Sequence, residues 1–252
     1  MYGAILKCVE NILVIGGAGG IGSAIVDKYV KCGANVLVGD IAYSQPCKLS
    51  PQDHCFPIDV TKLESLLDLA HHLKHHTITH LVSLAGGAIP EEYHQGIAGV
   101  PISAIDKTIQ LNLTSHAYII KTFVSLMQGK GDKSITLISS INAIQDWDLP
   151  CYSAAKAGLL GLVYATTTEL GEKGIRINVI LPGTTPTPRT GKEPKDFEAL
   201  LKTSALGRLT TPEEVANAVY ATTHLLTAMT GQMLVVDCGQ TVKKPRYTTK
   251  NQ

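Results

Sequence analysis

The sequence predicts an α/β protein with one doubly wound, parallel sheet of about seven strands and helices on both faces. Short apolar runs alternate with segments of helical period along the whole chain. The predicted strands are apolar throughout, which is typical of parallel strands buried on both faces. The 252 residues contain no linker, repeat or low-complexity segment. Residues 1–252 are therefore expected to form a single domain.

The predicted elements alternate from the N-terminus onward. The first strand, 11–15, precedes a run of glycines and a helix at 21–32, in which apolar residues recur at helical spacing. The helix predicted at 61–76 is amphipathic, with leucines along its inner face. Further strands are expected at 35–39, 55–58, 80–85, 134–139, 176–181 and 232–236, and further helices at 103–127, 151–171 and 212–226.

Composition argues against several classes of protein. The net charge is +1 and the pI is near 7.7, with no basic block, which disfavours a nucleic-acid or membrane-surface role. The six cysteines lack a CxxC pair or a framework spacing, a pattern typical of reduced cytosolic thiols. No secretory signal is recognisable, and no apolar stretch approaches the roughly 20 residues that span a bilayer. We therefore expect a cytoplasmic protein that binds neither nucleic acid nor membrane.

A glycine-rich turn between the first strand and the first helix predicts a dinucleotide site. Glycines there permit a tight turn, close approach of the backbone to a pyrophosphate, and a helix N-terminus aimed at it. Asp40 ends the second strand, where a carboxylate can bind both ribose hydroxyls and would repel a 2′-phosphate. This charge argument favours NAD over NADP. The residues of the turn expected to contact NAD are Gly16, Gly19, Gly20, Ile21 and Gly22.

Asp59 and Val60 follow the third predicted strand and allow two interpretations. The carboxylate of Asp59 and the main chain of Val60 can meet the adenine edge of the cofactor. Alternatively, Asp59 can cap a helix near Thr61. The sequence favours neither interpretation over the other.

Tyr152 and Lys156 lie four residues apart and therefore share one face of a predicted helix. A tyrosine hydroxyl titrates near ~10 and is a poor base at neutral pH. A fixed positive charge favours the phenolate and lowers its pKa toward the working pH, which suits carbonyl–alcohol chemistry. This spacing is common by chance, so its weight depends on the surrounding motifs.

Those motifs fall in one order at one set of intervals, and together they resemble the short-chain dehydrogenase/reductase family over nearly the whole chain. They are the glycine turn, Asp40, Asp59, Asn112, Ser139, Ser140, Tyr152, Lys156, Pro182 and Gly183. Individually each motif is common, and jointly they are specific. The resemblance implies a Rossmann-type fold and an NAD-dependent oxidoreductase.

The resemblance also assigns a role to each of four residues. Tyr152 would transfer the proton, and Lys156 would lower the tyrosine pKa and bind the nicotinamide ribose. Ser140 would hold the substrate oxygen, and Asn112 would support a proton relay through water. The further cofactor contacts that the resemblance implies are Ala85, Gly86, Tyr152, Lys156, Pro182, Gly183 and Thr187.

The match is imperfect at the serines and at two loops. In the family the second serine of a strand-end pair is usually catalytic, which selects Ser140, whereas the commonest interval to the tyrosine selects Ser139. Neighbouring residues of a strand face opposite sides, so only one serine can face the site, and we favour Ser140. Ile15 stands where the family commonly has threonine, and Ser83 and Leu84 replace an asparagine pair. At these positions the side chains that usually support the neighbouring loops in the family are replaced by others.

Other chemistry-bearing residues are expected to be structural. Histidines at 71, 72, 75 and 76 form i,i+4 pairs on the polar side of a helix, which predicts a solvated face without a metal. Cys151 is expected to be packed and unreactive. The pocket walls are expected from 86–101, 142–150 (with Trp147) and a lid at 183–207 whose charges include Arg189, Lys192 and Lys195, and residues 240–252 are expected to form a polar surface tail.

The sequence therefore predicts hydride transfer between NAD(H) and a secondary alcohol or ketone, with no metal. An NAD-dependent isomerase or lyase, and a non-catalytic nucleotide sensor, are alternatives on the same scaffold. The sensor is expected to lack the tyrosine, lysine or serine, and all three are present. The resemblance implies a homodimer or homotetramer packed through 103–127, 151–171 and the last strand. The sequence does not identify the alcohol.

Overall fold

The computed structural model describes residues 10–48, 54–145, 148–188 and 194–243. Within these ranges the strands form one eight-stranded sheet in the order β3-β4-β2-β1-β5-β6-β7-β8. All neighbouring strands pair in parallel except β3, which pairs antiparallel with β4 at one edge. The predicted parallel, doubly wound sheet is confirmed, and the short antiparallel strand is an addition that the sequence did not reveal.

The observed elements lie close to the predicted ones. The strands are β1 (Asn11–Ile15), β2 (Asn35–Asp40), β3 (Cys47–Lys48), β4 (His54–Pro57), β5 (His80–Ser83), β6 (Lys133–Ile138), β7 (Ile175–Pro182) and β8 (Met233–Val236). The helices are α1 (Gly20–Lys31), α2 (Leu63–His72), α3 (Gly96–Gly99), α4 (Ile102–Ile109), α5 (Ser115–Phe123), α6 (Pro150–Glu172), α7 (Pro194–Thr203) and α8 (Pro212–Tyr220).

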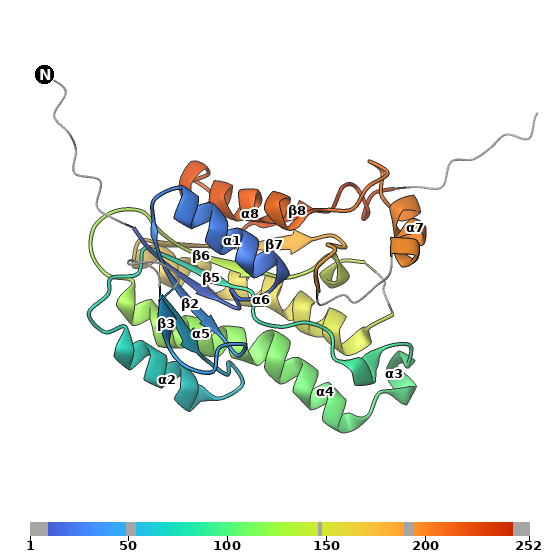
Figure 1. Ribbon diagram of the computed structural model, residues 1–252, viewed down its shortest axis with the longest axis horizontal. Coiled ribbons are helices and arrows are strands. Elements are labelled where there is room, and N and C mark those ends of the chain that lie inside the picture. Colours follow the sequence, from blue (N-terminus) through green and yellow to red (C-terminus); the bar gives the residue numbers. More distant parts are fainter. Residues whose placement is uncertain (1–9, 49–53, 146–147, 189–193, 244–252) are drawn as a thin grey trace, which may run out of the picture.

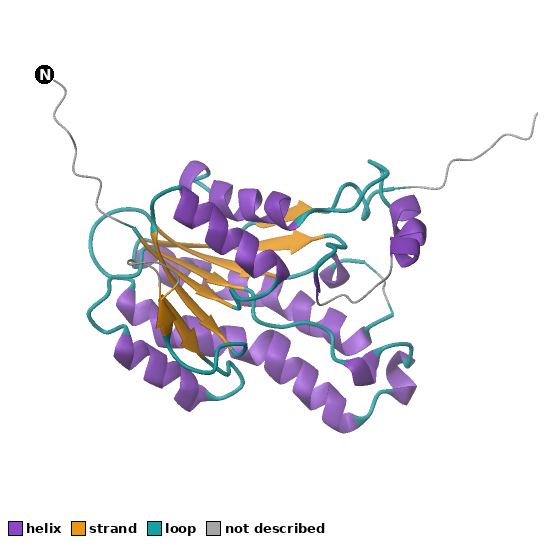
Figure 2. Ribbon diagram, in the orientation of Figure 1, coloured by secondary structure: helices purple, strands orange, loops and turns teal. Residues whose placement is uncertain are grey.

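The sheet lies between two layers of helices (Figures 1 and 2). Helices α1 and α8 cover one face, where Ile25 and Val219 pack on Val14. Helices α2, α4, α5 and α6 cover the other face, with a larger core to which Phe123 and Leu159 contribute. Both faces of the central strands are therefore buried, which explains why apolar residues of these strands point to both faces rather than to one.

The helix predicted at 103–127 is confirmed as a continuous helical segment from 102 to 126, but its turns are not all α-helical. Between α4 and α5 the backbone widens into a π-helical turn at Gln110–Thr114. Such turns are rare and occur frequently at functional sites. The predicted range runs through both helices because hydrophobic periodicity does not register one wide turn.

The C-terminal part of the chain differs from the expected surface tail. Gln240 is 3 % exposed, and its Oε1 accepts a hydrogen bond of 2.7 Å from the Thr184 amide. The predicted tail, 240–252, therefore begins too early, because the chain up to Gln240 is part of the packed structure. Residues 244–252 lie outside the described residues.

Two further findings concern the predictions from composition. Cys55, on β4, is disulfide-bonded, which corrects the expectation that the thiols are all reduced. None of the helices among the described residues combines the length and the apolar character needed to cross a bilayer.

Candidate active site

A cleft of about 1010 Å³ opens at the carboxyl ends of the parallel strands. It includes the point between β1 and β5 where the strand order reverses, which is the usual ligand site of open α/β sheets. Residues far apart in the sequence meet in this cleft. The predicted site residues on its wall are Gly16, Gly19, Gly20, Ile21, Gly22, Asp40, Asp59, Val60, Ala85, Gly86, Ser140, Tyr152, Lys156, Pro182, Gly183 and Thr187.

The glycine turn leaves no room for side chains. Gly16 has a φ of +97°, and a Cβ there would lie 2.7 Å from the Ala85 amide nitrogen. A Cβ on Gly22 would overlap the carbonyl oxygen of Gly16. Gly19 caps α1 without a side-chain hydrogen bond, so the first amides of this helix are not satisfied by a cap. The turn thus offers a bare backbone and a helix N-terminus to an anion, which fits a pyrophosphate.

Asp40 ends β2 on the cleft wall and is tied to the glycine turn. Its Oδ2 accepts a hydrogen bond from the Ala18 amide at 2.9 Å, and its Oδ1 accepts one from the Ala42 amide at 2.9 Å. Each carboxylate oxygen can accept more than one hydrogen bond. The oriented carboxylate therefore retains capacity for two ribose hydroxyls.

Asp59 lies on the cleft wall and also closes a local turn. Its Oδ1 accepts hydrogen bonds from the amide and the hydroxyl of Thr61, at 3.0 and 2.6 Å. Burial alone would raise the pKa of Asp59, but the Thr61 hydrogen bonds and the Lys62 ammonium outweigh burial and lower it. Helix α2 begins at Leu63 with Lys62 as its N-cap, so Asp59 is not the cap itself. The structure supports the turn and leaves the adenine contact a prediction.

Tyr152 and Lys156 lie one turn apart on α6, and both reach the cleft. Lys156 is 3 % exposed, and its Nζ donates a hydrogen bond of 3.0 Å to the Ile138 carbonyl. The same Nζ lies 5.7 Å from the centre of the Tyr152 ring. The buried ammonium is thus fixed beside the phenol, which is the arrangement that favours a phenolate.

The two adjacent serines have different partners. Ser139 is 5 % exposed, and its hydroxyl donates a 2.8 Å hydrogen bond to the Lys156 carbonyl. Ser140 is half-buried, and its hydroxyl bonds to Asn142 at the start of a 3₁₀ turn. Both serines reach the cleft wall, but only the Ser139 hydroxyl is held by the helix backbone. This difference favours Ser140 as the residue that meets a substrate oxygen.

Asn112 is the predicted catalytic residue that lies behind the cleft wall. It is fully buried in the π-helical turn. Its Oδ1 accepts a hydrogen bond from the Gly87 amide at 2.7 Å, and its Nδ2 donates to the carbonyls of Gly87 and Thr108 at 3.1 Å each. A Cβ on Gly86 would lie 2.6 Å from this Oδ1. The Asn112 side chain therefore holds the loop after β5 in place, and its role in a proton relay stays a prediction.

Glu92 is a site residue that no sequence pattern predicted. It is fully buried, and its Oε1 accepts hydrogen bonds from the amides of Cys151 and Tyr152 at 2.6 and 2.8 Å. Its Oε2 accepts a hydrogen bond from Thr108 at 3.2 Å. The carboxylate thus caps α6 at the turn that carries Tyr152. Its signal was weak, because Glu92 follows another glutamate in an irregular loop.

His116 was also missed and lies behind the lysine. Its Nδ1 is 2.7 Å from the hydroxyl of Ser83, one of the residues that depart from the family pattern. Burial, with a contribution from the Lys156 charge, lowers the pKa of His116 to about 3. A neutral imidazole therefore supports the floor of the site. The serine at 83 has a structural partner of its own.

The substrate end of the cleft is lined by residues from three loops. The three loops are those predicted from the sequence, and their residues on the cleft wall include Ala88, Pro90, Tyr93, Asn142, Leu149 and Thr185. Tyr93 is 46 % exposed. Trp147, Arg189 and Lys192 lie outside the described residues, as does the side chain of Lys195.

Comparisons with known proteins identify relatives of this chain. A family model described as Enoyl-(Acyl carrier protein) reductase matches residues 16–241. Cis-4-hydroxycyclohexanecarboxylate dehydrogenase of Sinomonas cyclohexanicum is 31 % identical over 245 residues, which is 92 % of this chain and 97 % of the relative. Dehydrogenase/reductase SDR family member 6 of Danio rerio is 32 % identical over 243 residues, covering 90 % and 96 %.

Among solved structures, an oxidoreductase of the short chain dehydrogenase/reductase family from Burkholderia thailandensis superimposes with a TM-score of 0.81. It is 29 % identical, and the match covers 93 % of this chain and 94 % of that one. The fold and the cleft define a dehydrogenase that uses a nicotinamide cofactor. The chain belongs to the short-chain dehydrogenase/reductase family, and the curated relatives that it matches are named as dehydrogenases or reductases, one of them acting on a hydroxycyclohexanecarboxylate. The expected family, fold and class of enzyme are confirmed.

Proposed function

We propose that this protein is an NAD-dependent dehydrogenase that interconverts a secondary alcohol and a ketone. The observation that carries the proposal is the Tyr152 phenol beside the buried Lys156 ammonium, on the same cleft wall as Ser140 and the glycine turn. The phenol is half-buried rather than sealed from the cleft. An alcohol oxygen could reach both hydroxyls.

The proposed mechanism assigns one task to each side chain. The Ser140 hydroxyl would hold the substrate oxygen, and the Tyr152 Oη would take the alcohol proton in oxidation or return it in reduction. Lys156 would favour the phenolate through its charge and would contact the nicotinamide ribose. When bound, the cofactor would supply the hydride acceptor or donor.

NAD is favoured over NADP by the charge at the ribose end. The Asp40 carboxylate is oriented by two backbone amides and would repel a 2′-phosphate. The neighbouring Ile41 and Ala42 on the cleft wall supply no cation to bind one. The remaining predicted contacts would hold the nicotinamide half of the cofactor at the other end of the cleft. They are Ala85, Gly86, Pro182, Gly183 and Thr187.

We also propose that the chain forms a homodimer or homotetramer in the cytoplasm. Tyr164 of α6 is 60 % exposed and Met233 of β8 is 38 % exposed, on two of the elements expected at an interface. Gly161 meets no atom within 4 Å, so this part of α6 is open to a partner. Gly158 of the same helix is not open in this way, because a Cβ there would lie 2.7 Å from the Leu113 side chain of the same chain. Light scattering that finds only monomer at micromolar concentration would contradict this assembly.

The deciding experiment replaces Tyr152 by Phe. NAD reduction is first screened over hydroxy acids, cyclic alcohols, sugars and steroid-like alcohols. The variant should bind NADH as the wild type does while turnover on the best substrate is lost. Tyr164→Phe, on an exposed position of the same helix, is the matched control and should keep full activity. Substantial turnover by Tyr152→Phe would refute the proposed mechanism.

A further inference from the structure

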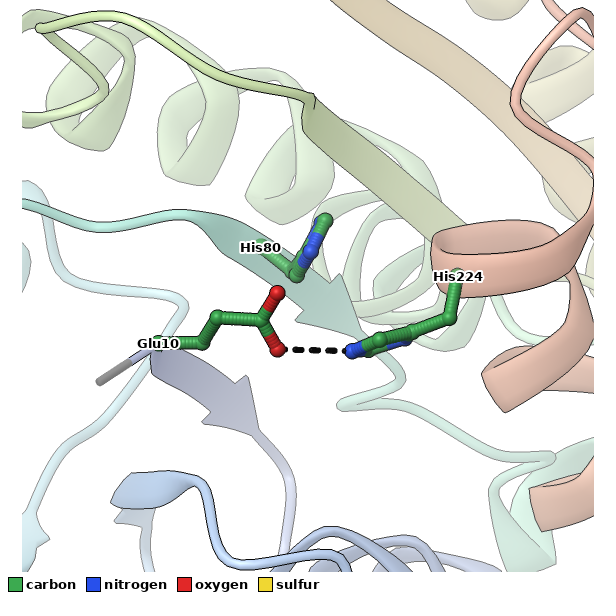
Figure 3. Close-up of side chains that lie close together, drawn as sticks. All are labelled: Glu10, His80 and His224. Atoms are coloured by element: carbon green, nitrogen blue, oxygen red, sulfur yellow. Dashed lines mark hydrogen bonds and ion pairs between the residues drawn. The ribbon is translucent and has the colours of Figure 1, made fainter. Parts of the chain in front are cut away.

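Three potential metal ligands meet at the amino ends of the central strands, on the side of the sheet opposite the cleft. Glu10 immediately precedes β1, His80 opens β5, and His224 lies in the π-helical turn Ala221–Leu225 after α8. One ligand atom from each lies within 4.8 Å of the other two. Figure 3 shows the Glu10 carboxylate between the two histidine side chains, with its ion pair to His224 marked. These residues approach one another at the amino ends of the strands, so they are separate from the proposed catalytic residues.

Both imidazoles are oriented by a hydroxyl at their Nδ1 atom. The Nδ1 of His80 is 2.8 Å from the Ser134 hydroxyl, and the Nδ1 of His224 is 2.6 Å from the Thr223 hydroxyl. Outer hydrogen bonds of this kind fix the ring and the tautomer of metal-binding histidines. The His224 Nε2 then faces the Glu10 carboxylate at 2.8 Å.

Aromatic packing restricts the His224 ring further. The Tyr220 ring stacks on it with centres 4.4 Å apart and an interplanar angle of 7°. The His80 ring lies 4.9 Å away on another side. A ring confined in this way presents its Nε2 in one direction, so little side-chain conformational entropy is lost when a ligand binds.

We propose that Glu10, His80 and His224 form a zinc site. Two imidazoles and one carboxylate are a donor set that suits Zn²⁺, whereas Mg²⁺ and Ca²⁺ prefer oxygen ligands alone. In tetrahedral coordination neighbouring ligand atoms lie about 3.3 Å apart. The Glu10–His224 pair would therefore open by about half an ångström, and His80 would move inward. Glu10 can adjust because its side chain is 41 % exposed.

The surroundings fit a bound cation and an entry path. His80 is 2 % exposed, and burial lowers its pKa to about 4, so its imidazole is neutral as a ligand must be. The side chain of His224 is 17 % exposed, which leaves the cluster open to solvent for a fourth ligand, such as water. The nearby positive charge of Arg176 is paired with Asp132 at 2.6 Å. Zinc would tie the segment before β1 to β5 and to the end of α8, and would stabilise the native state by binding it selectively.

Calorimetry and native mass spectrometry of chelator-treated full-length protein test the proposal. We expect one Zn²⁺ per chain, a raised melting temperature with Zn²⁺, and no comparable effect of Mg²⁺. Glu10→Gln and His224→Gln should each weaken zinc binding at least about tenfold, and Ser134→Ala should weaken it through His80. Glu10→Gln changes a partly exposed residue, so it keeps the test decisive if the His224 variant folds poorly.

Two controls separate this site from other ligands of the chain. His71→Gln with His75→Gln removes exposed imidazoles elsewhere and should leave zinc affinity unchanged. The Co²⁺-loaded protein should show the ligand-field bands of nitrogen and oxygen ligands without thiolate charge transfer. Absence of stoichiometric zinc, retention of zinc by Glu10→Gln, or a thiolate band would each overturn the proposal. Enzyme activity does not enter the test, so failure of the proposed dehydrogenase function would not affect it.

Discussion

The carboxylate of Glu92 accepts a hydrogen bond of 2.8 Å from the backbone amide of Tyr152, across 60 positions of the chain. The acid belongs to the loop after β5, and the tyrosine belongs to the first turn of α6. A buried anion at a helix N-terminus satisfies unpaired amides and is stabilised by the helix dipole. The loop that lines the substrate end is thereby fastened to the helix that supplies the proposed proton-transfer residue.

Replacement of Glu92 should therefore affect turnover more than cofactor binding. Glu92→Ala removes the cap, and we expect a stability loss of about 1–2 kcal/mol and a kcat reduced at least about tenfold, with little change in NADH affinity. Glu92→Gln keeps an acceptor oxygen but removes the charge. A nearby negative charge opposes ionisation of a phenol, so the acidic limb of the pH profile should move to lower pH in this variant.

The neighbouring glutamate provides the control for these variants. Glu91 is exposed and pairs only with Lys107, at 3.5 Å, among the interactions described. Glu91→Gln should leave kcat, the pH profile and the melting temperature unchanged. If Glu92→Gln also has an unshifted pH profile with full activity, then Glu92 stabilises the fold without positioning Tyr152.

Asp40→Ala should change the choice of cofactor. Loss of the carboxylate removes the repulsion of a 2′-phosphate and the acceptor for the ribose hydroxyls. We expect the ratio of kcat/KM for NADH over NADPH to fall on the order of tenfold or more, which is about 1.4 kcal/mol per factor of ten. Asp27→Ala, at an exposed position on α1, should leave the ratio unchanged. A ratio unaffected by Asp40→Ala would show that another residue selects the cofactor.

The two serines should separate catalysis from stability. Ser140→Ala is expected to lower kcat about a hundredfold while the melting temperature stays near that of the wild type. Ser139→Ala removes the hydrogen bond to the Lys156 carbonyl, so its main effect should be a stability loss of about 1 kcal/mol. Steady-state kinetics and thermal melts of both variants decide the assignment. The reverse pattern would make Ser139 the residue that holds the substrate.

The sequence predicted the fold and most of the cleft because both depend on local signals. Apolar runs gave strands within a few residues, and the glycine turn and Asp40 follow strands directly, so topology brings them together. Glu92 and His116 were not predictable in this way. Their hydrogen-bond partners lie on other elements, α6 and β5, and no local residue spacing predicts a contact between distant segments. The antiparallel strand β3 was not predicted either, because a strand of two residues is too short to show a hydrophobic period.

Stability should fall between neutral and mildly acidic pH because of buried histidines. Burial lowers the pKa of His116 to about 3 and that of His80 to about 4, against about 6.5 in an unfolded chain. Between these values the unfolded chain binds more protons than the folded one, so the free energy of unfolding decreases as the pH drops below about 6.5. Each histidine should contribute about 1.4 kcal/mol per pH unit in that window.

Urea unfolding at about pH 7.5, 6 and 5, with EDTA present to remove metal ions, measures this slope. His116→Gln should retain only the part of the slope that His80 contributes, whereas His72→Gln, at an exposed position, should keep the full slope. The carboxylate of Asp132 affects stability at lower pH than the histidines do. Burial would raise its pKa, but pairing with Arg176 lowers it, so the stabilising effect of this carboxylate is lost only below about pH 4. A free energy of unfolding that is constant from pH 7.5 to 5 would contradict the assignment of neutral, buried histidines.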